Sequence, residues 1–180
     1  AGGGGKGSQG GGGGVTTLMI ACRVGHGDAV DELIEARADV NFVTSGEESV
    51  CALGMAAEQG HEDIVAALLV AGADPNILRT NDASAKSYPP IMLAASAGVP
   101  KVVKLLLKAS ADANAFSRYS CGLMRACMYG HLETARTLLD NGADVNAMSS
   151  RNETALMYAS RYGHTSVVLL LFERGFDIVK

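Results

Sequence analysis

A fivefold internal repeat constrains the fold of this chain more than any other feature. Each copy carries two small residues, two variable residues and a glycine, and the glycines stand at positions 25, 60, 98, 130 and 163. The intervals between them are 35, 38, 32 and 33 residues. Repeats of this length indicate one supersecondary unit per copy, stacked so that neighbouring units bury a shared core.

Each copy contains two short apolar segments separated by the repeated glycine. The second segments cover residues 29–34, 64–69, 102–107, 134–139 and 167–172, and each ends in a turn such as Gly72-Ala73-Asp74-Pro75-Asn76. Glycine after a helix supplies the left-handed cap that lets the chain reverse. We therefore predict an all-α repeat fold, an α-solenoid of helix-turn-helix units joined by hairpin loops.

The repeats divide the chain into a tail and an array. Residues 1–13 are mostly glycine, which predicts a flexible tail. Its lysine is followed by glycine rather than by the Ser or Thr of a phosphate-binding loop, so we predict no nucleotide site. The predicted array covers residues 14–180, with repeats at 14–42, 43–77, 78–115, 116–147 and 148–180.

These repeats resemble the ankyrin repeat family over residues 14–180. The resemblance rests on segments such as Ala56-Ala57-Glu58-Gln59-Gly60-His61 and Gly142-Ala143-Asp144-Val145-Asn146, each present in several divergent copies. The family's Thr-Pro-Leu-His start is altered, because no copy keeps its histidine. Four copies have methionine there, at positions 19, 92, 124 and 157. We interpret these methionines as flexible apolar core residues.

The histidines and cysteines are repeat positions rather than a reactive cluster. The four histidines (26, 61, 131 and 164) all follow the repeated glycine, so they lie about 10 Å apart in a stack and cannot share a zinc ion. We expect them to hydrogen-bond to neighbouring backbone. The four cysteines (22, 51, 121 and 127) stand where small apolar residues are wanted, which predicts buried free thiols. We predict no catalytic residue, no cofactor and no metal.

Charge and hydropathy exclude further classes. A net charge of −4, from 15 basic and 19 acidic residues, does not suit a nucleic-acid binder. No apolar run reaches the roughly 18 residues of a membrane span. Acidic residues of the first repeat (Asp28, Asp31, Glu32 and Glu35) have the spacing of a solvated helix face. Together with the free thiols, these features favour a cytoplasmic protein that is not an enzyme.

The resemblance implies that a partner protein binds the concave face, formed by hairpin tips and exposed positions of the first helices. Its second half is rich in Tyr, Arg and Met, which are enriched at interfaces. The candidate partner-binding residues are Arg118, Tyr119, Met128, Tyr129, Arg151, Arg161 and Tyr162. We predict a scaffold or adaptor, or a subunit of a larger assembly, that binds an acidic or apolar segment through repeats four and five.

Two alternatives stay open: a regulatory or targeting domain of an enzyme whose catalytic part lies outside this chain, and a stand-alone inhibitor. The end of the array adds a further expectation. Leu169 and Leu170 stand where most earlier repeats have polar or small residues. Because terminal repeats usually present a polar outer face, we expect further repeats or a partner to cover this side.

Overall fold

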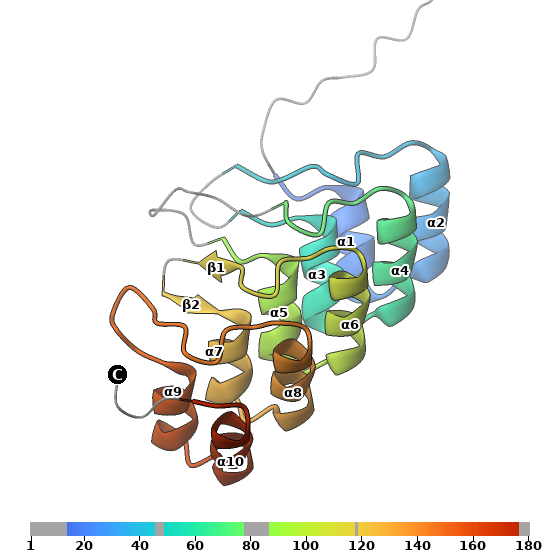
Figure 1. Cartoon of the computed structure of the whole chain (residues 1–180). Helices are drawn as coiled ribbons and strands as arrows, with labels where there is room; N and C mark the ends of the chain where they lie inside the picture. Colours follow the sequence, from blue (N-terminus) through green and yellow to red (C-terminus); the bar gives the residue numbers. More distant parts are fainter. Residues whose placement is uncertain (1–13, 46–48, 78–86, 118, 177–180) are drawn as a thin grey trace, which may run out of the picture.

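Helix pairs stacked in one direction make up the structure, a computed structural model that describes residues 14–45, 49–77, 87–117 and 119–176. The first helices of the pairs are α1 (Thr17–Val24), α3 (Ala52–Gln59), α5 (Pro90–Ala97), α7 (Gly122–Met128) and α9 (Ala155–Arg161). The second helices are α2 (Gly27–Glu35), α4 (Glu62–Val70), α6 (Pro100–Lys108), α8 (Leu132–Asp140) and α10 (Thr165–Glu173). Each helix contacts its partner and the equivalent helix of the next pair, giving the two rows seen in Figure 1. The predicted all-α repeat fold is confirmed.

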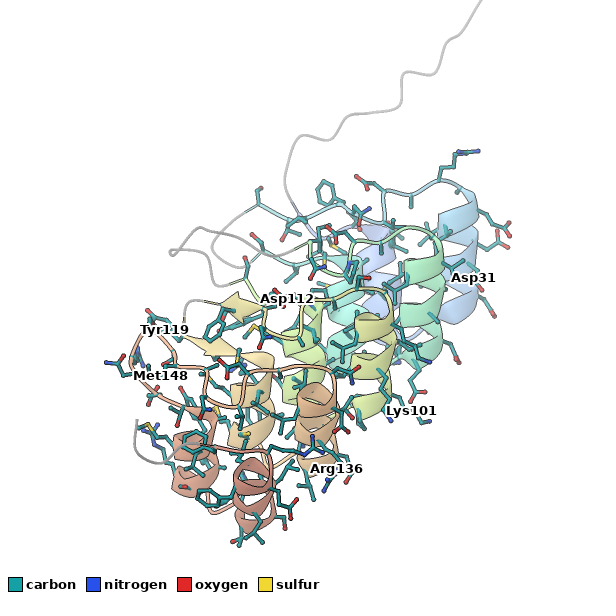
Figure 2. The ribbon with its side chains drawn as sticks, viewed as in Figure 1. Asp31, Lys101, Asp112, Tyr119, Arg136 and Met148 are labelled. Atoms are coloured by element: carbon teal, nitrogen blue, oxygen red, sulfur yellow. The ribbon has the colours of Figure 1, made fainter. Side chains whose placement is uncertain are left out.

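Hairpins connect the pairs and extend to one side of the stack (Figure 1). The strands β1 (Phe116–Ser117) and β2 (Ser120–Cys121) pair antiparallel, and single bridges join Val43 to Cys51 and Met148 to Thr154. Figure 2 shows Tyr119 and Met148 on this hairpin side, whereas Asp31, Lys101 and Arg136 lie on the second-helix side. The Gly-rich tail and residues 78–86 of the longest connection lie outside the described residues.

The core lies between the two rows and is built from small residues and methionine. Met19, Met92 and Met124 are at most 1% exposed, as predicted for core residues. Met157 was expected to be equally buried, and this prediction is wrong, because its side chain is 51% exposed. It occupies the last described pair, so no following helix covers it among the described residues.

The repeated glycines end the first helices as the sequence predicts. All five have positive φ, from 72° at Gly98 to 88° at Gly25. After two of the second helices the left-handed position is taken by Arg37 and Ser110, with φ of 59° and 68°. A side chain in this conformation costs roughly 1 kcal/mol relative to glycine.

In the first three turns, asparagine side chains join the turn to the next repeat. Asn76 accepts a hydrogen bond from the backbone amide of Asp112 (2.9 Å) and donates one to the carbonyl of Ser110 (3.0 Å). Asn41 and Asn114 make the equivalent pairs with the repeats that follow them. The aspartate two residues before the asparagine accepts a hydrogen bond from the asparagine's backbone N–H, as Asp74 does from Asn76 at 2.8 Å. The amide group thereby satisfies backbone groups that a turn would otherwise leave open.

Candidate functional site

A groove of about 280 Å³ lies on the hairpin side of the third, fourth and fifth repeats. We call it the Arg/Tyr groove, because three arginines and three tyrosines form much of its wall. Its lining residues are Tyr88, Ser117, Tyr119, Ser120, Met124, Arg125, Met128, Arg151, Glu153, Tyr158 and Arg161.

Two sequence signals place these side chains together. In α7, Arg125 and Met128 are three residues apart, and in α9, Tyr158 and Arg161 have the same spacing. Residues three apart on a helix share one face, so each helix presents a pair to the groove. The β1–β2 hairpin adds Tyr119, and the next hairpin adds Arg151 and Glu153.

The arginines stack on tyrosines of the preceding repeat. The guanidinium carbon of Arg125 lies 4.6 Å from the ring centroid of Tyr88, and that of Arg151 lies 4.4 Å from the ring centroid of Tyr119. Both pairs step from one repeat to the next in the same direction. Cation–π contacts at these distances are attractive, and they hold the flat guanidinium groups in defined planes.

The third arginine is neutralised within the groove. Arg161 donates to Oε1 of Glu153 at 3.0 Å, and the hydroxyl of Tyr158 donates to Oε2 at 2.6 Å. The hydrogen bonds from Tyr158 and Arg161 hold the pKa of Glu153 below its usual range. Burial, together with the hydrogen bond to Glu153, raises the pKa of Tyr158 to about 12. Glu153 is therefore ionised, and Tyr158 is protonated, at neutral pH.

The guanidinium group of Arg125 differs from that of Arg161 in its hydrogen bonding. Its Nε atom is buried and has no hydrogen-bond partner among the described residues. Arg151 is exposed, with its guanidinium over Tyr119. The groove thus holds three guanidinium groups and one carboxylate, although the whole chain has a net charge of −4. Its local charge is opposite to that of the protein.

The structure brings together four of the seven predicted partner-binding residues. Tyr119, Met128, Arg151 and Arg161 line the groove, and Arg118 lies outside the described residues. Tyr129 and Tyr162 cap the ends of α7 and α9 and are about half exposed. Their rings lie beside the histidines of their own repeats, with centroids 6.0 Å from His131 and 6.4 Å from His164. These two tyrosines are not part of the groove lining.

Seven groove residues were not among the predicted partner-binding residues: Tyr88, Ser117, Ser120, Met124, Arg125, Glu153 and Tyr158. A signal for two of them was present in the repeat itself. The residue before the pair of small residues in each first helix is Ile20, Met55, Leu93, Arg125 and then Tyr158. The change from apolar to Arg and Tyr marks the repeats whose first helices carry the groove.

The cysteines do not form a nucleophilic site. All four are free and buried, as predicted. Burial raises the pKa of Cys22 and Cys127 to about 12 and that of Cys51 to about 11. Because the thiolate is the reactive form, these groups are poor nucleophiles at neutral pH.

The surroundings of two histidines and of the acidic residues of α2 also indicate structural roles rather than a reactive site. The Nε2 atoms of His131 and His164 lie 3.0 Å and 3.1 Å from the carbonyl oxygens of Ser96 and Met128, so the predicted backbone hydrogen bonds are confirmed for these two. The carboxylates of α2 are exposed, as expected for an outer face. Within the described ranges, no three His, Cys, Asp or Glu side chains are grouped so as to hold a metal ion. No helix in those ranges is long and apolar enough to cross a membrane.

The stacked pairs define a repeat protein with a laterally open groove. A family model described as ankyrin repeats (3 copies) matches residues 4–79, 53–149 and 91–180. The chain therefore belongs to the ankyrin repeat family, as the sequence resemblance indicated. No curated protein sequence matches it. Ankyrin repeats are protein–protein interaction modules, and membership of the family makes this chain such a module.

Proposed function

We propose that this chain is a non-enzymatic scaffold or adaptor of the cytoplasm that binds a partner protein through the Arg/Tyr groove. The observation that carries the proposal is the alignment of Arg125 on Tyr88 and Arg151 on Tyr119 in one groove. Tyr and Arg are among the residue types enriched at binding hot spots. Here both types line one hollow that spans three repeats.

The stacking supports binding because it removes part of its entropic cost. A mobile arginine loses rotamer freedom when it is fixed by a partner, about 0.5–1.5 kcal/mol per side chain. In the groove, the tyrosine rings already hold Arg125 and Arg151 in place. The surface is therefore ordered before a partner arrives.

Charge favours an acidic segment in the partner. Three guanidinium groups against one carboxylate leave the groove positive, and opposite charges increase both association rate and specificity. Met128 adds apolar contact area within the same hollow. An acidic segment that also contains apolar residues would match both features.

The last helix pair supports a second part of the proposal, namely that further repeats or a partner cover the C-terminal face. Met157 is 51% exposed, whereas the equivalent Met19, Met92 and Met124 are at most 1% exposed beneath the next repeat. Leu169 is 57% exposed at a position that is Asp31 in the first repeat. Leu170, expected to share this exposure, is instead buried, because it faces the core.

Affinity capture from the native cell, followed by mass spectrometry and calorimetry with the captured partner, tests the proposal. The groove variant Tyr119→Ala/Arg151→Ala is expected to lose partners that the wild-type chain retains. The variant Tyr129→Ala/Tyr162→Ala tests whether the interface extends past the groove. Arg23→Ala is the control, because Arg23 is an exposed arginine of the first repeat that does not line the groove. Equal retention by the groove variant and the control would contradict the proposal.

A further inference from the structure

We infer that the Arg/Tyr groove is a receptor for one anionic group on a partner peptide, a carboxylate or a phosphate, bound by Arg125 and Arg151. The inference rests on the proposed function and adds to it the chemistry of the partner. It starts from the difference among the three arginines. Arg161 is hydrogen-bonded to the Glu153 carboxylate at 3.0 Å, whereas Arg125 and Arg151 are stacked on tyrosines of the preceding repeat, and Arg151 interacts with Glu153 only through its charge.

Arg125 carries the strongest evidence. Its Nε atom is buried and lacks a hydrogen-bond partner among the described residues, although α7 places the side chain in the wall of the groove. A buried donor on a charged group is costly to leave without an acceptor. An anionic oxygen bound by this guanidinium group from the groove would compensate its charge.

The stacked geometry suits an anion better than a neutral group. A guanidinium lying on an aromatic ring keeps its N–H groups at its edge, directed away from the ring and available to an acceptor in its own plane. Arg125 and Arg151 are both held in this way, on successive repeats. Carboxylate and phosphate oxygens match such edges with two parallel hydrogen bonds.

A second cavity next to the groove favours placing the anion over repeats four and five. Tyr88 lines both the groove and a second cavity of about 230 Å³ over the second and third repeats. That cavity contains Met55, Leu93 and Glu58, so it is apolar and carries a carboxylate. An anionic group is repelled there and attracted beyond Tyr88. A peptide that crosses Tyr88 would therefore place apolar residues over repeats two and three and its anion over repeats four and five.

Three short fluorescent peptides test this inference with the full chain. They share one sequence of apolar and Gly/Ser residues and differ at one position, which is glutamate, phosphoserine or glutamine. We expect at least one anionic peptide to bind about tenfold more tightly than the glutamine peptide, with a preference that weakens as salt screens the charges. The glutamate and phosphoserine peptides distinguish the two possible sources of the anion. In ¹H–¹⁵N spectra, the side-chain Nε–H signals of Arg125 and Arg151 should shift, and that of Arg23 should not.

Variants separate the charge from the fold. Arg125→Gln should abolish the preference for the anionic peptides, Arg125→Lys should retain part of it, and Arg23→Gln should leave it unchanged. Thermal unfolding of each variant shows whether the fold is intact, and the Nε–H shifts of the wild-type chain provide a test that needs no substitution. Equal affinity for all three peptides would overturn the inference while leaving groove binding itself intact. Absence of any shift at Arg125 and Arg151 up to about 10 mM anionic peptide would also overturn it.

Discussion

The imidazole of His131 is hydrogen-bonded through Nε2 to the carbonyl oxygen of Ser96, 3.0 Å away in the preceding repeat. A carbonyl can only accept, so the ring nitrogen is the donor. The same ring fills the space beside Gly98, where an added Cβ would lie 2.5 Å from Nδ1. His164 repeats this relationship with Met128 and Gly130, and the ring of His61 lies against Gly25. One histidine position thus joins successive repeats by both hydrogen bonding and packing.

Replacing His131 should weaken the joint between the third and fourth repeats. We expect His131→Ala to lower the free energy of unfolding by about 1–3 kcal/mol, because it leaves the Ser96 carbonyl without its partner and opens space beside Gly98. His26→Ala is the matched control, since His26 has the same repeat position but is exposed, and no helix pair precedes its own among the described residues. Urea unfolding followed by circular dichroism measures both, and equal losses would show that the joint is not the cause.

Gly98 should tolerate a side chain less well than its equivalent in the last repeat. Gly98 and Gly163 have similar φ angles, 72° and 75°, so alanine costs roughly 1 kcal/mol of backbone strain at each. Among the described residues other than its chain neighbours, none has an atom within 4 Å of a Cβ added at Gly163, whereas at Gly98 the His131 ring occupies that space. We expect Gly98→Ala to cost about 1–3 kcal/mol more than Gly163→Ala. In the double variant Gly98→Ala/His131→Ala this excess should shrink, and a fully additive double variant would contradict the explanation.

Ser110 offers the opposite change, a stabilising one. Its φ of 68° lies in the left-handed region, where glycine carries no Cβ penalty. Its backbone carbonyl keeps the hydrogen bond from Asn76 whatever side chain is present. We expect Ser110→Gly to raise the free energy of unfolding by about 1 kcal/mol. The reverse change, Gly142→Ser, at the equivalent position with φ of 87°, should lower it by a similar amount. A stabilisation by both changes would exclude backbone strain as the cause.

Much of the fold could be predicted because the sequence of each repeat contains local signals for its helix ends and turns. Gly60 and Gly98 mark helix ends, and Asp74 and Asn76 mark a turn, through chemistry that acts within a few residues. Repetition then confirms the assignment. The exposure of Met157 could not be predicted in this way, because it depends on a neighbour on the far side of the last pair rather than on its own repeat.

The groove was only partly predictable for a related reason. Tyr119 and Arg151 were chosen for their residue types, but their stacking depends on hairpins of successive repeats being side by side. Tyr88 was not singled out as a candidate residue, because it lies at the end of the long, irregular connection, where repeat spacing gives no register. Tyr129 and Tyr162 are of a residue type common at interfaces. They lie at the ends of their helices, however, where their rings are beside the histidine rings of the same repeats.

The buried thiols predict a chain that is chemically inert when folded and less stable at alkaline pH. The pKa of Cys22 is raised from 9.0 to about 12, so the unfolded state loses this proton first. The protonated Cys22 thiol therefore contributes fully to the free energy of unfolding below pH 9. This contribution is lost as the pH rises from about 9 to 12. We expect little alkylation of the native chain by iodoacetamide at pH 8, and four modified cysteines after urea unfolding, both counted by mass spectrometry. Rapid native modification would contradict the burial of the thiols.

Tyr158 and Glu153 predict a pH dependence inside the groove itself. Burial and the 2.6 Å hydrogen bond to Glu153 raise the pKa of Tyr158 from 10.0 to about 12, so the folded chain holds this proton more tightly than the unfolded chain. The stabilisation is complete below pH 10 and is lost as the pH rises toward 12. The difference in tyrosinate absorbance between the wild-type chain and Tyr158→Phe should titrate near pH 12. Glu153→Gln should lower that midpoint only in part, because burial, the larger cause, remains. A midpoint near 10 in the wild-type chain would contradict both the burial of Tyr158 and its hydrogen bond to Glu153.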